Sequence, residues 1–95
     1  MKRKRVRMYT RVGCEDSSAA RDFLREHGVP FEEVNIDRNP EALAFVMNVN
    51  EGKQRTPTFE VDGHTFHCSP FDPHKFVREL GLQPAVFARK GVRTE

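Results

Sequence analysis

The stretch VRMYTRVGCEDS, residues 6–17, decides the fold of this chain. Its first part alternates apolar with polar or aromatic side chains, which predicts a β-strand over residues 5–10. A helical pattern begins near Ser17, so Cys14 lies between the end of a strand and the N-terminus of a helix. The free N–H groups and the dipole of a helix N-terminus favour a thiolate over a thiol, and the thiolate is the nucleophilic form. The stretch therefore predicts a reactive cysteine at a strand-to-helix turn.

The rest of the chain predicts an alternation of short strands and helices. The apolar spacing favours helices over residues 16–27, 40–49 and 74–80, and strands over residues 31–36, 58–61 and 64–68. Asn39, Pro40 and Asp72 are typical of helix starts, and Asp62-Gly63 is typical of a two-residue hairpin turn. The order is β-α-β-α-β-β-α, with the first two strands parallel because a helix joins them. This order predicts an α/β fold in which helices cover both faces of a four-stranded mixed sheet.

Each predicted helix has one apolar face that we expect to point into the core. The residues on these faces are Ala20, Phe23, Leu24 and His27; Leu43, Val46 and Met47; and Phe76, Val77 and Leu80. Their spacing of three and four positions is that of one side of an α-helix.

The composition fits one small soluble domain over residues 1–95, with an ordered core over about residues 5–82. Apolar residues make up 37% of the chain and charged residues 32%. No apolar run approaches the roughly 18 residues that a membrane helix needs, and nothing resembles a signal peptide, so no membrane partner is expected. Two cysteines are too few for a disulfide framework, which favours a reducing, cytoplasmic location.

The net charge of +2 is unevenly distributed. Six basic residues precede the first acidic one, and the C-terminal tail carries more: Lys2, Arg3, Lys4, Arg5, Arg7 and Arg11, then Arg89, Lys90 and Arg93. Few aromatic residues lie among them, so a solvated basic arm and a loose tail are expected rather than a nucleic-acid surface. The same charges would suit a surface that attracts an anionic substrate.

In its element order, its Cys14 and its later Thr56-Pro57 pair, the chain resembles a glutaredoxin, a member of the thioredoxin-like fold, over roughly residues 5–82. The sequence YTRVGC, residues 9–14, is similar to the family's Tyr-Thr-Lys-x-x-Cys motif, and Thr56-Pro57 is similar to the end of its Thr-Val-Pro motif. Ser17 stands where dithiol members carry a second cysteine, so the chain resembles a Cys-x-x-Ser, monothiol-type variant.

The resemblance implies a role for each matching residue. Cys14 would be the nucleophile, and Ser17 would donate a hydrogen bond to its thiolate. Arg11 would hold a carboxylate of glutathione, which an arginine can do with two hydrogen bonds. Pro57 would be a cis-proline facing the cysteine, which leaves the backbone of Thr56 free to pair with an extended glutathione or peptide.

The chain also departs from the family's motifs. Glu15-Asp16 replaces the Gly-Phe of the iron–sulfur-carrying monothiol members, and two carboxylates beside the sulfur should raise the pKa of Cys14. Arg55 replaces the first residue of Thr-Val-Pro and is counted with Arg11, Thr56 and Pro57 among the expected glutathione-binding residues. The family's Gly-Gly pair after the last strand is replaced by His67-Cys68.

The sequence allows two interpretations of Cys68. On strand alternation it shares a face with Phe66, which is consistent with a buried core cysteine. The last strand of such a fold ends near the active-site turn, so Cys68 could instead be a resolving thiol that closes a disulfide with Cys14. His64, His67 and His74 lie nearby without the spacing of a zinc site, and no metal is expected.

These residues together predict a thiol–disulfide oxidoreductase that reduces glutathione mixed disulfides or protein disulfides through Cys14. Glutathione, or a similar low-molecular-weight thiol, would be a cosubstrate rather than a bound cofactor, and disulfide-containing or glutathionylated proteins would be the partners. Two alternatives remain: an iron–sulfur cluster carrier, and a catalytically weak thioredoxin-like module that binds a partner protein.

Overall fold

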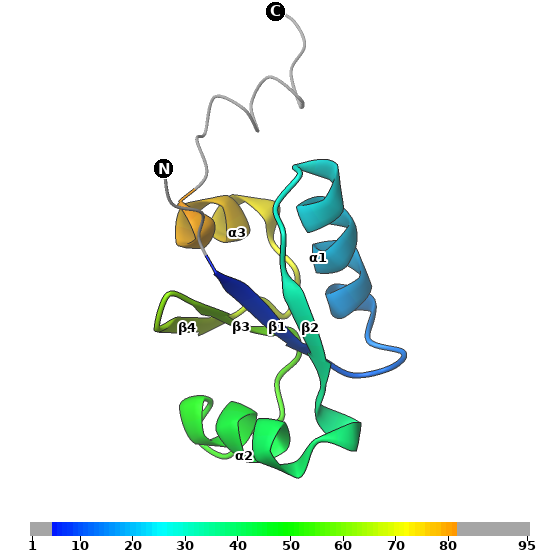
Figure 1. Cartoon of the computed structure of the whole chain (residues 1–95), viewed down its shortest axis with the longest axis vertical. Coiled ribbons are helices and arrows are strands. Elements are labelled where there is room, and N and C mark those ends of the chain that lie inside the picture. Colours follow the sequence, from blue (N-terminus) through cyan, green and yellow to red (C-terminus); the bar gives the residue numbers. More distant parts are fainter. Residues whose placement is uncertain (1–4, 82–95) are drawn as a thin grey trace, which may run out of the picture.

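A computed structural model describes residues 5–81, which form one α/β unit (Figure 1). Its elements are β1 (Val6–Thr10), α1 (Glu15–Glu26), β2 (Glu32–Asn35), the 3₁₀ turn η1 (Ile36–Arg38), α2 (Pro40–Val49), β3 (Thr58–Val61), β4 (His64–His67) and α3 (Pro73–Leu80). The predicted element order is confirmed. The basic residues at positions 2–4 and 89–93 and the predicted C-terminal tail lie outside the described residues.

The four strands form one mixed sheet in the order β2-β1-β3-β4. β1 is parallel to β2 and antiparallel to β3, and β3 and β4 form an antiparallel hairpin. The hairpin turns at Asp62 and Gly63, whose φ angles of 51° and 88° are both positive. Two successive positive φ angles define the turn type for which Asp-Gly is favoured. Because β1 lies between β2 and β3, the residues that follow Thr10 lie at one end of the sheet.

Several predicted boundaries differ from the observed ones by one residue, and one of these differences has a clear local cause. The strand expected over residues 31–36 ends at Asn35, and Ile36 belongs to the 3₁₀ turn η1. The Asn35 side chain accepts a hydrogen bond from the backbone N–H of Asp37 at 2.8 Å, which turns the chain out of the sheet. Ile36 is nevertheless buried, because the turn directs it beneath the sheet. This turn also brings Asp37 close to the end of β1, where it matters for the site described below.

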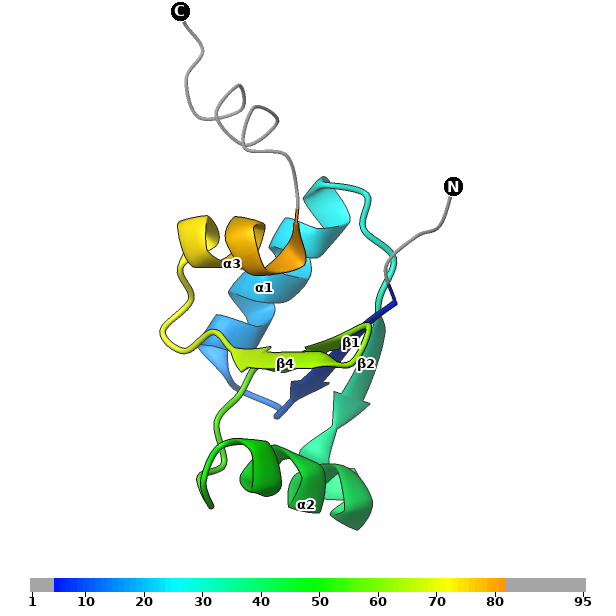
Figure 2. The ribbon, with the colours of Figure 1, turned by 90° about the vertical axis from the view of Figure 1, so that its left-hand side faces the viewer.

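The core is divided between the two faces of the sheet. Helices α1 and α3 cover one face and α2 covers the other (Figures 1 and 2). The larger cluster includes Met8, Leu24, Phe59, Phe76 and Leu80. The smaller cluster joins Tyr9 and Ile36 to Ala42 and Val46 of α2, with Leu43 and Phe45 partly buried against it. Among the helix residues expected in the core, His27 and Met47 are only partly buried.

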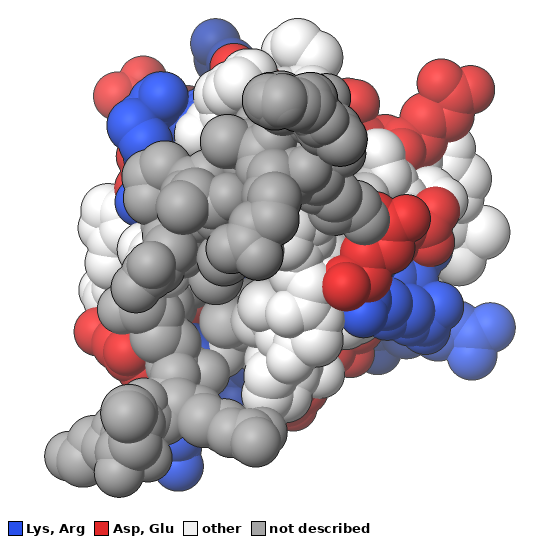
Figure 3. All heavy atoms as spheres, turned by 90° about the horizontal axis from the view of Figure 1, so that it is seen from above, with Lys and Arg blue, Asp and Glu red and all other residues white. Residues whose placement is uncertain are grey.

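No helix within residues 5–81 is both long enough and apolar enough to cross a lipid bilayer. The view from the α3 end of the molecule shows acidic and basic side chains interspersed around the exposed rim (Figure 3). That face, where it is not covered by grey atoms, therefore carries no field of a single sign.

The start of α2 gives a test of local stability. The Asn39 side chain accepts a hydrogen bond from the backbone N–H of Ala42 at 3.0 Å, and Pro40 follows as the first helical residue. We expect Asn39→Ala to lower the free energy of unfolding by about 1 kcal/mol, because one N–H at the helix start loses its acceptor. Chemical denaturation would measure the change. Asn48→Ala, on the exposed side of the same helix, is the control; an equal loss in both variants would contradict the capping role.

Candidate active site

Cys14 occupies the turn between the C-terminal end of β1 and the start of α1. It is the N-cap residue of α1, with extended backbone angles, and its carbonyl accepts the Ser18 N–H at 3.1 Å. The turn that leads to it closes with a hydrogen bond from the Cys14 N–H to the Arg11 carbonyl at 3.2 Å. Gly13 allows this turn because its φ of 85° is unfavourable for other residues. The sulfur therefore lies at the positive end of a helix and is partly exposed.

The opposite side of the sulfur faces the loop that leads into β3. The Thr56-Pro57 peptide bond is cis, as the resemblance to glutaredoxins implies. The Thr56 hydroxyl donates a hydrogen bond to the Cys14 sulfur at 3.2 Å, and the sulfur lies 3.4 Å from the Thr56 carbonyl oxygen, to which a protonated thiol can donate. Cys14 is therefore placed between a helix N-terminus and the residue that precedes the cis-proline.

The pKa of Cys14 is set by two opposing effects. Burial acts to raise it, but the nearby Ser17 hydroxyl, the hydrogen bond from the Thr56 hydroxyl and the backbone N–H groups of Ser17 and Asp16 together outweigh burial, so the pKa lies below its usual value. The pKa is lowered although Glu15 and Asp16 are expected to raise it, and neither carboxylate is among the main causes of the shift. The Asp16 carboxylate accepts a hydrogen bond from the backbone N–H of Phe71 at 3.0 Å, and Glu15 is exposed to solvent.

Ser17 is completely buried directly below the cysteine turn. Its hydroxyl makes no hydrogen bond of ordinary geometry within residues 5–81. It nevertheless lies close enough to the Cys14 sulfur to lower the pKa of the thiol. A buried hydroxyl without another partner is available to donate to the sulfur whenever the sulfur is negatively charged.

Arg11 already has a carboxylate partner in the structure. Its Nε donates to both carboxylate oxygens of Asp37 at 3.1 and 3.2 Å, one terminal nitrogen lies 3.0 Å from the same side chain, and that nitrogen donates to the Gln54 side chain at 2.6 Å. Asp37 comes from the 3₁₀ turn η1. The position that resembles a glutathione-carboxylate contact is thus occupied by this chain's own carboxylate.

A second ion pair supports the cysteine turn from the side. The Glu33 carboxylate accepts hydrogen bonds from Arg21 of α1 at 2.9 and 2.6 Å and from the Thr10 hydroxyl at 2.9 Å. These bonds join β2 and α1 to the last residue of β1. Hydrogen bonds from Arg21 and Thr10 lower the pKa of Glu33 although its partial burial opposes them, so the carboxylate stays ionised. The sequence pattern does not predict the ion pair of Arg21 and Glu33, because the two residues belong to different elements.

Cys68 lies in the larger core cluster and is 1% exposed. Burial raises the pKa of its thiol, and its sulfur lies 3.7 Å from the Asp72 carbonyl oxygen. Its backbone N–H donates to the Pro57 carbonyl at 3.1 Å, so β4 ends beside the cis-proline, as expected. Reaction of this thiol with Cys14 would require the core to open, and its role as a resolving thiol stays a prediction.

The other expected site residues lie along the same loop. Pro57 is fully buried, and Arg55 is partly exposed with its carbonyl oxygen bonded by the Thr58 hydroxyl at 2.7 Å. Residues 5–81 contain no cluster of three histidine, cysteine or acidic side chains that could hold a metal ion.

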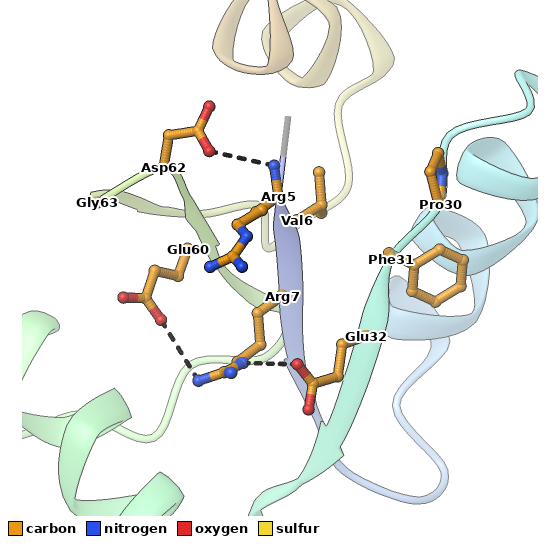
Figure 4. A pocket seen from close by; sticks show the side chains of 9 residues that line it. All are labelled: Arg5, Val6, Arg7, Pro30, Phe31, Glu32, Glu60, Asp62 and Gly63. Carbon is orange, nitrogen blue, oxygen red and sulfur yellow. Dashed lines mark hydrogen bonds and ion pairs between the residues drawn. The ribbon is translucent and has the colours of Figure 1, made fainter. Parts of the chain in front are cut away.

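A surface hollow lies at the opposite end of β1 from Cys14 (Figure 4). It measures about 830 Å³ and is lined by Arg5, Arg7, Glu32, Glu60 and Asp62 with neighbouring residues. Arg7 pairs with Glu32 at 3.1 Å and lies 3.9 Å from Glu60. These charges hold β1 between its two neighbours, and the hollow takes no part in the cysteine site.

Comparison with known proteins agrees with this geometry. The glutaredoxin family model matches residues 6–66. The glutaredoxin-like protein NrdH of Lactococcus lactis subsp. lactis (strain IL1403) is 29% identical over 73 residues, which cover 77% of this chain and 96% of that protein. The NrdH protein of Lactococcus lactis subsp. cremoris (strain MG1363) matches to the same extent. The chain belongs to the glutaredoxin family.

Solved structures show the same fold. The NrdH-redoxin from Escherichia coli, a glutaredoxin-like protein with a thioredoxin-like activity profile, superposes with a TM-score of 0.63 at 27% identity and covers 78% of this chain and 92% of its own. The thioredoxin-like protein BC3987 superposes with a TM-score of 0.66 at 22% identity, covering 77% and 96% respectively. The thioredoxin-like fold predicted from the sequence is confirmed.

The hydrogen bond from Thr56 to the sulfur can be tested by removing the hydroxyl alone. We expect Thr56→Val to raise the pKa of Cys14, because the thiolate loses one donor, and to slow alkylation by iodoacetamide at pH 7 roughly three- to tenfold. The measurement is the alkylation rate as a function of pH.

Thr65→Val, which makes the same change in the middle of β4, is the matched control. Equal pH profiles for the two variants and the unaltered protein would show that the Thr56 hydroxyl does not stabilise the thiolate.

Proposed function

We propose that this member of the glutaredoxin family is a monothiol thiol–disulfide oxidoreductase whose substrates are mixed disulfides between proteins and a low-molecular-weight thiol such as glutathione. One observation carries the proposal. The partly exposed Cys14 thiol has a lowered pKa at a helix N-terminus, while the chain's other thiol, Cys68, is 1% exposed and has a raised pKa. Cys14 can therefore ionise and reach a disulfide, whereas Cys68 is buried and remains a protonated thiol.

The reaction follows from having a single reactive sulfur. The Cys14 thiolate attacks the small-thiol sulfur of the mixed disulfide, a new S–S bond forms, and the protein thiolate leaves and takes a proton from water. A second molecule of the small thiol then attacks, as its thiolate, the sulfur bound to Cys14. The products are the small-molecule disulfide and the free Cys14 thiolate. The net change converts the mixed disulfide and one free small thiol into the protein thiol and the small-molecule disulfide, and no resident cofactor takes part.

Ser17 and Thr56 have their main effect in the second step. Cys14 leaves as a thiolate, and a leaving group with a lower pKa departs faster. The Thr56 hydroxyl already donates to this sulfur at 3.2 Å, and the buried Ser17 hydroxyl lies beside it. The same donors that favour attack by Cys14 therefore also favour its release.

The identity of the small thiol depends on Arg11. A glutathione carboxylate that binds Arg11 must displace Asp37, whose oxygens lie 3.0–3.2 Å from the guanidinium nitrogens. We infer that glutathione binds weakly at this position, so that protein disulfides are further substrates. The likeness to the E. coli NrdH-redoxin, with its thioredoxin-like activity profile, supports this extension. We place the reaction in a reducing compartment such as the cytoplasm, because both cysteines are free thiols.

Intact mass after exposure of the reduced protein to oxidised glutathione tests the mechanism. We expect a gain of one glutathione, retained in Cys68→Ala and lost in Cys14→Ser. Loss of two hydrogens instead, dependent on both cysteines, would establish a Cys14–Cys68 disulfide and a dithiol mechanism. No reaction of the unaltered protein would exclude the proposed chemistry.

The role of Asp37 can be tested separately. Asp37→Asn keeps the size of the side chain but removes the charge that neutralises Arg11, so the guanidinium becomes available to an external carboxylate. We expect KM for glutathione, measured by reduction of a glutathionylated peptide, to fall about three- to tenfold. Glu32→Gln breaks a comparable surface pair with Arg7 far from the site and is the control. An unchanged KM in Asp37→Asn would contradict this assignment.

A further inference from the structure

Three basic side chains from separate segments gather where the β3–β4 hairpin meets α3. We call Arg55, His67 and Lys75 the cationic cluster. His67 is the last residue of β4 and pairs with Thr58, whose hydroxyl bonds the Arg55 carbonyl at 2.7 Å. The Lys75 ammonium group, from the first turn of α3, donates to the His67 carbonyl at 2.8 Å. The two permanent cations therefore lie on either side of His67.

The backbone of the cluster is joined to the loop that contacts the reactive sulfur. Arg55 directly precedes Thr56, whose hydroxyl donates a hydrogen bond to the Cys14 sulfur at 3.2 Å. The backbone N–H of Cys68, the residue after His67, donates to the carbonyl of the cis-proline at 3.1 Å. A disulfide substrate that pairs with the Thr56 backbone would thus lie near residues of the cluster.

The positive charges of the cluster are not neutralised within residues 5–81. Carboxylates there form ion pairs with Arg7, Arg11, Arg21 and His64, but with neither Arg55 nor Lys75. The carboxylates of Asp16 and Asp72 bind backbone N–H groups instead. Asp16 accepts from Phe71, and Asp72 caps α3 by accepting from His74 and Lys75.

His67 does not offset this charge. Its ring is partly buried, and burial, Lys75 and Arg55 all lower its pKa, so it is neutral at physiological pH. Its buried Nδ1 has no hydrogen-bond partner within the described residues. The cluster therefore consists of two cations and a neutral ring, close in the chain to the Thr56 backbone with which a substrate pairs in the proposed reaction.

We propose that Arg55 and Lys75 form a carboxylate-binding subsite that selects disulfide substrates carrying a negative charge next to the sulfur attacked by Cys14. The proposal rests on the proposed function, since it concerns what occupies the same groove. Under this proposal the carboxylate is bound by Arg55 and Lys75 and not by Arg11, whose charge Asp37 neutralises. The chemistry recognised is a carboxylate, supplied by a small thiol or by an acidic side chain of a protein.

The test uses three small symmetric disulfides that differ mainly in charge: 3,3′-dithiodipropionate, hydroxyethyl disulfide and cystamine. In each reaction the Cys14 thiolate forms one mixed disulfide and releases one small thiolate, and intact mass over time gives the rate. We expect Lys75→Gln and Arg55→Gln each to slow the anionic disulfide about threefold at low salt, because one cation is removed near the reacting sulfur. The rate with the neutral disulfide should not change, and the rate with the cationic one should rise.

Arg78→Gln, an exposed cation one turn further along α3, is the matched control and should change none of the rates. Glutamine keeps a hydrogen-bond donor at each position, so the packing contacts of Lys75 and Arg55 are largely retained. Equal slowing of all three disulfides would assign a structural role to the cluster and overturn the proposal. Unchanged rates would also overturn it. Failure of hydroxyethyl disulfide to react with the unaltered protein would instead exclude the proposed function.

A second pair of measurements identifies the source of the carboxylate. Oxidised glutathione represents the small thiol, and a disulfide-bonded peptide with aspartate next to its cysteine, compared with its asparagine version, represents the protein. If Lys75→Gln slows only the reaction with oxidised glutathione, the subsite binds the small thiol. If it slows only the reaction with the aspartate peptide, the subsite binds an acidic protein segment. If it slows neither reaction, the proposal is overturned.

Discussion

The contact between the Cys14 sulfur and Thr56 is the interaction on which the rest of the site depends. It joins the turn after β1 to the loop before β3, two segments that the chain separates by the whole of α1, β2 and α2. β1 and β3 are neighbours in the sheet, so their ends meet at one edge. Because burial alone would raise the pKa of the sulfur, the site works only if the donors around it outweigh burial. The fold brings those donors together from both sides.

The fold could be predicted almost completely, because each of its elements is specified by neighbouring residues. Asn39-Pro40, Asp62-Gly63 and Asp72 each begin an element or a turn through contacts within a few residues, and the structure confirms all three. Cys14 and Pro57 could be found because the family motifs place them. The error at Asn35 has the same local origin, since a side-chain bond to the Asp37 N–H ends a strand that its apolar pattern would continue.

The electrostatics of the site could not be predicted in this way. Glu15 and Asp16 are close to Cys14 along the chain, but the size of a carboxylate's effect depends on where its side chain points and what it binds. Asp16 accepts a hydrogen bond from the backbone N–H of Phe71, 55 residues away, which its position in the sequence does not predict. The pairing of Arg11 with Asp37 also joins different elements. Ion pairs of this kind follow from the packing of η1 against the end of β1, which periodicity does not reveal.

The distribution of these ion pairs determines which cations remain to bind a substrate. Carboxylates from β2, β3 and η1 neutralise Arg7, Arg21 and Arg11, the last of which is the arginine that the family motif would offer to a substrate. Asp16 and Asp72 bind backbone N–H groups, and within residues 5–81 no carboxylate forms an ion pair with Arg55 or Lys75. In the proposed reaction the small thiol supplies the second sulfur, because the buried Ser17 stands where dithiol members carry a cysteine. The proposed selectivity for that thiol then depends less on the cysteine turn, which the motif describes, than on which cations the fold leaves without a carboxylate.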